Sequence, residues 1–389
     1  MANVLIGWEL GGGRGHLVSM KLIAEALIER GHRVTIAAQR TDVPLTMPPG
    51  VAMFQAPIWP GLLSTVGAGD GRVSTIVDVL ARLGLGRRGV LAGMISAWEA
   101  LIALSRADLV IADYAPALLV AARGRLPSVS VGPGFQVAPS DTDPIARLGG
   151  GSPGHNEGNL LDTVDAELRA AGRKPLPHLA ALFATDAPLI GSFPELDPYH
   201  RNDQTGRFIA PGLDGVPQLG AGQGDEVFVY ANNPIQANKP FWQAVVATRL
   251  PIRAHIPGID TSLRVAIAAM GVTVEPRPVP IDRIVARSRL CINHGAHGII
   301  CAMMLGGVPQ LMLPLDLEKG LHSAAVAHAG LGVLPPIDEN TVANLPAILR
   351  AAYHDAELVQ RVREATPGFH ARMTVPYGPA VAEAAAALL

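Results

Sequence analysis

Residues 290–333 read LCINHGAHGIICAMMLGGVPQLMLPLDLEKGLHSAAVAHAGLGV and show the repeating pattern of the chain most clearly. Short apolar runs, 290–292 and 310–313, alternate with segments whose apolar residues recur at helical spacing. The polar turns 293–295 and 316–320 follow these runs. This order of strand, turn and helix is the repeating unit of a parallel α/β sheet. Ligands of such sheets bind beyond the carboxyl ends of the strands, where helix N-termini attract anions.

The beginning of the chain has the same pattern. An apolar run at 3–7 leads into the glycine-rich turn 11–15, and 17–30 has helical periodicity before a second apolar run at 33–38. A strand, a glycine-rich turn, a helix and a strand make one Rossmann-like unit. Gln39 stands where a dinucleotide-binding protein has an acidic residue, and the glycine spacing also differs. The pattern therefore argues against bound NAD.

Similar alternation continues through the rest of the chain. Strands are expected at 51–57, 108–112, 127–131, 188–191, 207–210, 226–231, 252–256 and 272–275, and helices at 115–124, 158–171, 176–184, 241–247, 263–270, 281–286 and within 339–389. The segment 132–158 is rich in Gly, Pro and Ser and is expected to be a mobile loop over a site. The segment 211–225, PGLDGVPQLGAGQGD, has the composition of a linker. It would separate two α/β domains.

Composition excludes several classes of protein. The 389 residues suffice for two domains, and the net charge of −2 gives no reason to expect a nucleic-acid partner. Two cysteines without a CxxC motif indicate a reducing compartment. The start of the chain lacks the pattern of a signal peptide, and no apolar run is long enough to span a membrane. We therefore expect a cytoplasmic protein without a transmembrane segment.

A family resemblance rests on the stretch quoted first. It resembles the donor-binding signature of the inverting GT-B glycosyltransferases that include the UDP-glycosyltransferases and the bacterial macrolide and rhamnosyl transferases. The matching residues, without a gap, are His294-Gly295, Gly298, Gly307-Val308-Pro309, Pro314 and Gly330. The resemblance implies an α/β protein of two Rossmann-like domains facing each other across a cleft. Residues 1–210 would bind the acceptor and 226–375 the nucleotide sugar, with 211–225 as linker and 376–389 as a helix that crosses back to the first domain.

His16 and Asp113 are the candidate catalytic residues. His16 follows the turn that contains Gly13, Arg14 and Gly15, which form the expected acceptor-side loop. A neutral histidine there could take a proton from an acceptor hydroxyl, given a carboxylate to orient it. In the family that the chain resembles, the histidine after such a turn is the general base, and an aspartate ending a later strand orients it. The alternatives are a histidine without a catalytic role and an N-cap role for Asp113.

The donor site is expected around His294. The family counterpart of this histidine donates a hydrogen bond to the diphosphate of the donor, with backbone N–H groups of the next helix in support. Those groups would belong here to Gly295, Ala296, His297 and Gly298, where small residues allow close approach. Asn232 and Asn233, at the end of the strand expected at 226–231, are further donor-site candidates.

Several donor-site residues depart from the family pattern. Ile299 stands where the family has a phosphate-binding Thr or Ser, and Ala302 stands where it has Glu or Gln on the ribose. Glu318 and Lys319 replace the Asp-Gln pair that holds the sugar hydroxyls. An unusual donor, a lost transfer activity and a different ligand are three open explanations. On this basis we expect UDP-glucose to bind poorly, and Ala302→Glu with Ile299→Thr to strengthen nucleotide binding.

A metal ion is one such different ligand. His294 and His297 are three residues apart, Glu318 and His322 are four apart, and Asp316 lies close by in the sequence. Together they would form a credible set of nitrogen and oxygen ligands. The family resemblance, however, implies that no metal is needed.

The favoured hypothesis is an inverting, metal-independent glycosyltransferase that needs no cofactor beyond its co-substrate. Its partners would be a nucleotide-sugar donor and a small-molecule acceptor, and a homodimer stays open. The alternatives are a non-catalytic binding or scaffold subunit of a biosynthetic complex, and a GT-B enzyme with an unusual donor, such as a nucleotide-sugar epimerase, or with a bound metal.

Overall fold

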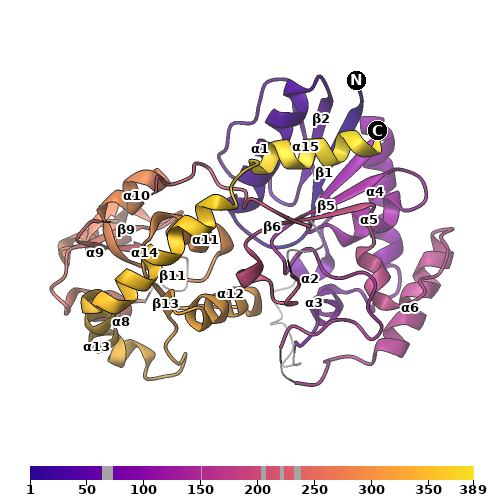
Figure 1. The fold of residues 1–389 in the computed structure, drawn as a ribbon. Coiled ribbons are helices and arrows are strands. Elements are labelled where there is room, and N and C mark those ends of the chain that lie inside the picture. The colour runs from indigo at the N-terminus through magenta and orange to yellow at the C-terminus, as the bar shows by residue number, and fades with distance from the viewer. Residues whose placement is uncertain (64–72, 150, 203–206, 220–222, 232–237) are drawn as a thin grey trace. The chain divides into compact units, whose positions relative to one another are not determined.

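The computed structural model of the protein describes residues 1–63, 73–149, 151–202, 207–219, 223–231 and 238–389 (Figure 1). The chain divides into two compact units. Unit 1 comprises Met1–Gly212 and Val375–Leu389, and unit 2 comprises Leu213–Thr374. Residues 213–225 are thus grouped with unit 2, and the last helix belongs to unit 1 although the chain reaches it through unit 2. No helix among the described residues has the length and apolarity to span a bilayer.

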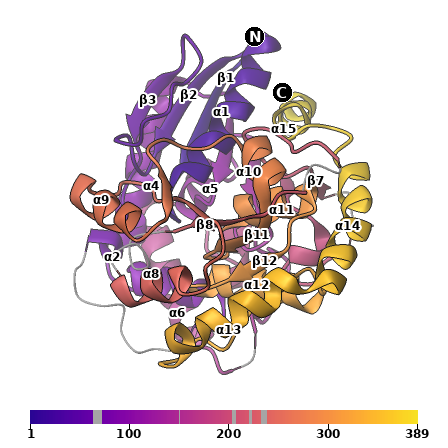
Figure 2. The same ribbon diagram turned by 90° about the vertical axis from the view of Figure 1, so that its left-hand side faces the viewer.

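Unit 1 is built on a parallel sheet, which in the described residues has seven strands in the order β3-β2-β1-β4-β5-β6-β7. Its strands are β1 (Asn3–Trp8), β2 (Arg33–Ala38), β3 (Ala52–Gln55), β4 (Leu109–Asp113), β5 (Ser128–Gly132), β6 (Ala187–Gly191) and β7 (Phe208–Ile209). Figure 2 shows β3, β2 and β1 side by side. The order reverses between β1 and β4, which is the topological switch point at which α/β sheets bind ligands.

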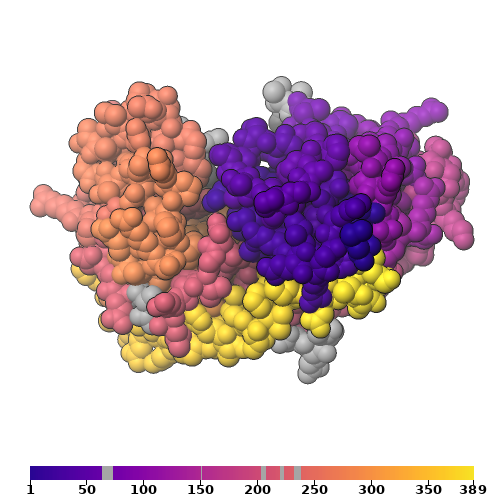
Figure 3. All heavy atoms as spheres, turned by 90° about the horizontal axis from the view of Figure 1, so that it is seen from above, coloured from indigo at the N-terminus to yellow at the C-terminus, as the bar shows by residue number. Residues whose placement is uncertain are grey.

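Helices cover both faces of this sheet. Those of unit 1 are α1 (Arg14–Glu29), α2 (Pro60–Leu63), α3 (Ile76–Leu83), α4 (Val90–Ser105), α5 (Pro116–Ala122), α6 (Glu157–Ala170) and α15 (Tyr377–Leu388). One face of β1 packs with α1 and α15 in a core that includes Ile6, Met20 and Val381. The earliest and latest parts of the chain lie side by side there (Figures 1 and 3). On the other face, an added Cβ at Gly7 would collide with Leu118 of α5 and Trp98 of α4.

The helix expected at 176–184 is wrong in type and length. The structure has a short 3-10 helix, Leu179–Phe183, followed by another at Pro194–Leu196. Pro175 and Pro177 explain the difference, because each disfavours the α conformation in the residue before it and lacks an N–H group. The loop expected between β5 and α6 is present, and α6 begins at Glu157.

Unit 2 repeats the architecture on a second parallel sheet, which in the described residues has six strands in the order β10-β9-β8-β11-β12-β13. Its strands are β8 (Glu226–Tyr230), β9 (Ile252–His255), β10 (Thr273–Glu275), β11 (Ser288–Asn293), β12 (Gln310–Met312) and β13 (Gly332–Val333). Its helices are α8 (Lys239–Val246), α9 (Thr261–Ala269), α10 (Ile281–Arg287), α11 (His297–Gly306), α12 (Leu317–His328), α13 (Thr341–His354) and α14 (Ala356–Ala371). The predicted strand–turn–helix repeat of residues 290–333 is confirmed as β11, α11, β12, α12 and β13.

Candidate active site

The topology of unit 1 brings His16 and Asp113 together. Trp8, the last residue of β1, lies in register with Asp113, the last residue of β4. The chain leaves β1 through the glycine turn and enters α1 at Arg14, which places His16 in the first turn of that helix. Gly13 supplies the N-cap with a φ of 103°, a value that favours glycine. Both side chains therefore stand at the carboxyl edge of the central strands.

The two side chains form a hydrogen-bonded dyad. His16 Nδ1 lies 2.9 Å from Asp113 Oδ1. The Asp113 side chain is 3% exposed and the His16 side chain 10% exposed. A carboxylate only accepts hydrogen bonds, so in a ring with one proton that donates to Asp113 the proton is on Nδ1 and the lone pair is on Nε2. This tautomer is the one that a general base needs.

Packing holds the imidazole of His16 in place. The indole of Trp8 stacks on it, with ring centroids 4.7 Å apart and planes at 15°. Gly11 approaches the other end of the ring, because a Cβ at Gly11 would lie 2.5 Å from Nε2. The structure thus adds Trp8 and Gly11 to the site. The glycine-rich turn 11–15 indicated that another group approaches its backbone closely, but the sequence did not identify the His16 ring as that group.

The last helix also reaches this region. Tyr377 of α15 is buried, and its ring fills the space that side chains at Gly191 and Gly212 would need. Its pKa is raised well above the ordinary value by burial and then by the charge of Asp113.

The expected acceptor-side loop is open, since a Cβ at Gly13 or Gly15 would meet nothing within 4 Å. Arg14 is partly exposed beside them.

In unit 2, a buried amide pair fixes the turn that carries His294. Asn293 is fully buried at the end of β11, and its Oδ1 accepts a 2.8 Å hydrogen bond from the N–H of Gly295. Its Nδ2 donates to Gln310 Oε1 on β12 at 2.9 Å. Gly295 has a φ of 83°, and a Cβ there would lie 2.6 Å from the carbonyl oxygen of Lys319 on α12. Asn293 directly follows an apolar run and Gln310 begins the next one, which was the signal in the sequence for their role.

His294 is a neutral histidine with one unpaired ring nitrogen. The residue is 6% exposed, and its ring stacks on Tyr230 with centroids 5.4 Å apart. Burial, and then the charge of Lys319, lower its pKa to about 4, although the backbone of Tyr230 hydrogen-bonds to the ring. Within the described part of the chain, the buried Nδ1 has no hydrogen-bond partner. A buried polar atom without a partner is unfavourable and suits a ligand-binding position.

The start of α11 is open to an anion. Its N-cap, Ala296, makes no side-chain capping bond. The first N–H groups of a helix have no acceptor within the helix, and they carry the positive end of its dipole. Gly298 is exposed, and a Cβ added to it would meet only Leu213, at 4.0 Å. His297 is partly exposed at the same helix start.

Ile299 and Ala302 lie in an apolar cluster, not on an open surface. Ala302 is 0% exposed and Ile299 is 8% exposed. Both pack with Phe228 of β8 and with Ile284 of α10. No side-chain atom of Ala302 is accessible to a ligand. A substitution at Ala302 is therefore expected to change the stability of the core before it changes ligand binding.

The remaining donor-site candidates lie at the start of α12 or outside the described residues. Asp316 is the N-cap, accepting from the N–H of Lys319 at 3.0 Å and pairing with its ammonium group. Glu318 is partly exposed in the first turn. Asn232 and Asn233 lie outside the residues that the structure describes.

The structure gives no support to the metal alternative. His297 lies near His322, with ring centroids 5.4 Å apart, and its Nε2 is 3.4 Å from Sγ of Cys301. Burial and the proximity of His322 hold the pKa of His297 well below its usual value. In the described ranges, no three or more His, Cys, Asp or Glu side chains form a group that could hold a metal ion.

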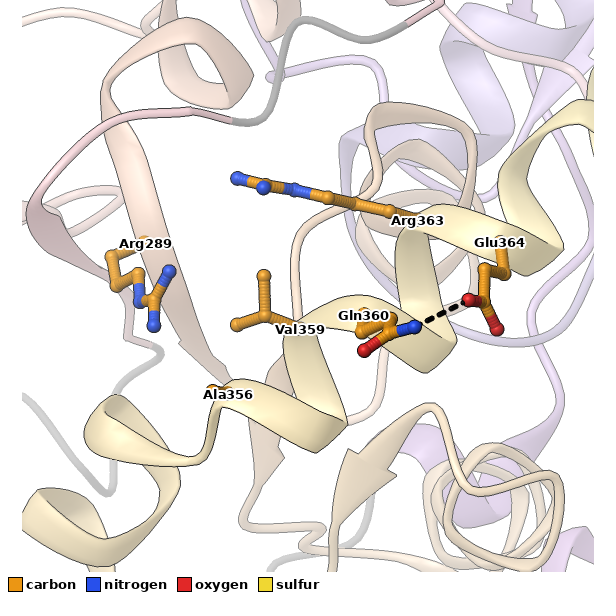
Figure 4. A pocket seen from close by; sticks show the side chains of 6 residues that line it. All are labelled: Arg289, Ala356, Val359, Gln360, Arg363 and Glu364. Atoms are coloured by element: carbon orange, nitrogen blue, oxygen red, sulfur yellow. Dashed lines mark hydrogen bonds between the residues drawn. The ribbon is translucent and has the colours of Figure 1, made fainter.

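A groove elsewhere on unit 2 is unrelated to these residues. It has a volume of about 410 Å³ and is lined by side chains of β11 and α14 (Figure 4). The lining residues are Arg289, Ala356, Val359, Gln360, Arg363 and Glu364. None of them was predicted as a site residue, and the side-chain amide of Gln360 is bonded to Glu364 at 2.8 Å.

Comparison with known proteins identifies the fold. No family model matches the sequence. The NDP-glycosyltransferase YjiC of Bacillus subtilis (strain 168) is 31% identical in an alignment of 117 residues, and the match covers 27% of this chain. The match spans only 30% of the length of that relative.

Solved structures match over the whole chain at low identity. The glycotransferase of kitacinnamycin has a TM-score of 0.68 and 18% identity, covering 100% of this chain and 99% of its own. The calicheamicin glycosyltransferase CalG4 has a TM-score of 0.69 and 18% identity, covering 100% and 98%. UGT2 of Phytolacca americana has a TM-score of 0.63 and 13% identity, covering 100% and 99%. The chain therefore has the fold of the GT-B glycosyltransferases, as the sequence predicted.

Proposed function

We propose that this protein is an inverting glycosyltransferase that moves a sugar from a nucleotide-sugar donor to a hydroxyl group of a small-molecule acceptor. The observation that carries the proposal is the 2.9 Å hydrogen bond between His16 and Asp113 at the topological switch point of unit 1. The partial match to an NDP-glycosyltransferase and the shared GT-B fold support it. Since a histidine and an aspartate need no metal to act as an oriented base, the proposed reaction needs none.

His16 would act on the acceptor. Nε2 takes the proton of the acceptor hydroxyl as the oxygen of that hydroxyl attacks the anomeric carbon of the donor sugar. Asp113 keeps the ring in the required tautomer and stabilises the imidazolium that forms. The bond from the anomeric carbon to the diphosphate oxygen breaks, and the configuration at that carbon inverts because the attack comes from the opposite face.

Unit 2 would bind the donor. The diphosphate fits the open start of α11, where the backbone N–H groups around Gly298 and the helix dipole favour negative charge. His294 Nδ1 is a buried polar atom available to the same group. The backbone N–H groups would stabilise the charge that develops on the leaving diphosphate, and His294 would add a donor when its ring is protonated. The similar UGT2 structure is described as a complex with UDP-2fluoro-glucose and pterostilbene, which matches this pairing of donor and acceptor.

The test is a transfer assay with UDP-glucose and dTDP-glucose against a panel of hydroxylated small molecules. We expect nucleoside diphosphate to be released only with a competent acceptor, and the product to have the inverted anomeric configuration by proton NMR. Retained configuration, or the absence of transfer to every acceptor, would contradict the proposal.

A non-catalytic binding or scaffold subunit of a biosynthetic complex is the second candidate. Ile299 and Ala302 favour it, because buried apolar side chains stand where the family resemblance leads us to expect polar contacts with a donor. Such a subunit would transfer no sugar in the assay above, and His16→Ala would then change no measurable activity.

A further inference from the structure

The carboxyl group of Glu9 is buried close to the dyad and has no part in the chemistry proposed above. Glu9 follows β1 and is 0% exposed. Because side chains alternate along a strand, Glu9 points to the face opposite Trp8. That is the face on which Gly7 packs against Trp98 of α4 and Leu118 of α5.

Four N–H groups converge on this carboxyl group. Oε1 accepts from the Trp98 indole at 2.7 Å and from the backbone N–H of Leu118 at 2.7 Å. Oε2 accepts from the Trp59 indole at 2.8 Å and from the backbone N–H of Ala117 at 3.3 Å. Burial raises the pKa of Glu9 to about 7, and these four bonds oppose the rise. All four donors suit a carboxylate, which only accepts hydrogen bonds.

Glu9 replaces the missing N-cap of α5. The residue before this helix, Ala115, makes no capping bond, and the first helical residue, Pro116, has no N–H group. The N–H groups of Ala117 and Leu118 precede the first bond within the helix and have no acceptor there. Glu9 accepts both, so a side chain from the end of β1 fixes the start of α5.

The hydrogen bonds from Ala117 and Leu118 to Glu9 fix the start of α5, and Asp113 lies just before this helix in the chain. Asp113 is separated from α5 only by Tyr114 and Ala115, and Tyr114 has a φ of 47°. A left-handed conformation is unfavourable for a residue with a side chain, so the surrounding structure has to maintain the turn. The main chain on the other side of Glu9 leads through Gly11 to His16.

We propose that Glu9 is a positioning residue that sets the distance and orientation between His16 and Asp113, by cross-linking the end of β1 to the start of α5 on the face of the sheet opposite the dyad. The dyad geometry is then maintained by two links: the hydrogen bond between His16 and Asp113, and the carboxylate of Glu9 behind it. The expected effect of Glu9 on catalysis rests on the proposed function, whereas its effect on the distance and orientation between His16 and Asp113 does not.

The test is Glu9→Gln. The amide has nearly the same shape, but its nitrogen cannot accept, so two of the four N–H groups lose their acceptor. In NMR spectra of the imidazole groups, the signal lost in His16→Ala identifies His16, and we expect that signal to shift in Glu9→Gln. With an acceptor, kcat should fall by roughly ten- to a hundredfold, as for a misplaced catalytic group. The KM for the nucleotide sugar should change less than about twofold on the same reasoning.

Glu167→Gln is the matched control. Glu167 is also buried, at 6% exposed, and its carboxylate also accepts backbone N–H groups at a helix start, from Gly89 at 2.7 Å and Ala92 at 3.3 Å. That helix is α4, which carries neither His16 nor Asp113. We expect Glu167→Gln to lower Tm while leaving the His16 signal and kcat unchanged.

Two results would overturn the proposal. One is an unchanged His16 signal in folded Glu9→Gln, and the other is an equal shift of that signal in Glu167→Gln. If Glu9→Gln does not fold, Glu9→Asp keeps the charge on a shorter side chain, and an unchanged His16 signal in that variant would also overturn it. Full turnover in His16→Ala would refute the proposed function alone, because the NMR signals would still report on the role of Glu9.

Discussion

Lowering the pH from 7 to 5 should tighten nucleotide-sugar binding, and His294 provides the reason. Its pKa is about 4 in the protein without ligand, so the ring is neutral at pH 7. The backbone of Tyr230 favours the protonated ring, and Nδ1 is the buried atom without a hydrogen-bond partner in the described residues. A neutral ring that donates from its other nitrogen has only a lone pair at Nδ1, which cannot donate to a phosphate. Protonation would let the ring donate to both groups.

The size of the effect follows from that extra bond. A hydrogen bond to a charged group is worth about 1.5–3 kcal/mol, and each pKa unit corresponds to about 1.36 kcal/mol. Ligand binding should therefore raise the pKa of His294 from about 4 to about 5–6. Because the pKa is higher in the bound state, affinity increases as the pH falls through this window and is flat above it. The expected gain between pH 7 and pH 5 is roughly two- to tenfold.

Calorimetry with UDP-glucose and dTDP-glucose measures this gain. A sugar ester of the diphosphate is the right probe, because it lacks the second phosphate ionisation near pH 6. His294→Gln is the control, since its amide donates at every pH and its affinity should not depend on pH in this range. Equal pH dependence in His294→Gln, or an affinity of the unmodified protein that does not change with pH, would contradict this role of His294.

Three further predictions concern the dyad, the core and the domain boundary. Gly11→Ala would put a Cβ 2.5 Å from His16 Nε2, at a residue with a φ of 83°, so the rate of transfer should fall at least tenfold with donor affinity unchanged. In the control Gly15→Ala the added Cβ meets nothing within 4 Å, so the transfer rate in the same kinetic assay should change little. Ala302→Glu would bury a carboxylate in the apolar cluster that contains Phe228 and Met303, so thermal denaturation should show a loss of several kcal/mol in stability. The control Ala324→Glu places the same side chain at an exposed position and should change stability little. Stronger nucleotide binding by a stable Ala302→Glu protein would show instead that the cluster opens for a ligand. Limited proteolysis should cut within 213–225, and the two fragments should stay together on a sizing column because α15 packs with α1. If the fragments separate, the packing of α15 on α1 is not strong enough to hold them together.

Much of the fold follows from local sequence patterns. The apolar runs and the periodic segments predicted both sheets, because strands buried on both faces need continuous apolar sequence. The proximity of His16 and Asp113 was also accessible, since both follow strands of one parallel sheet, and the register of Trp8 with Asp113 brings them together. Pro175 and Pro177 were visible as well, but the apolar residues after them favoured a longer helix than the prolines permit.

The rest depends on contacts between residues far apart in the chain. Glu9 lies 50 residues from Trp59 and 89 from Trp98, so nothing local reveals that their polar atoms meet. An acidic residue at the end of an apolar strand was the available signal. Ile299 and Ala302 were assigned to the donor from family positions, but the direction of their side chains depends on how α11 packs on β8 and α10. Sequence spacing does not determine that packing.

The central claim is that His16, oriented by Asp113, is the base for glycosyl transfer. The most direct measurement is turnover of His16→Ala with a competent donor and acceptor, beside calorimetry of the donor with the same protein. We expect kcat to fall by about a hundred- to ten-thousand-fold with unchanged donor affinity, because only proton removal from the acceptor is lost. Full turnover in His16→Ala would contradict it.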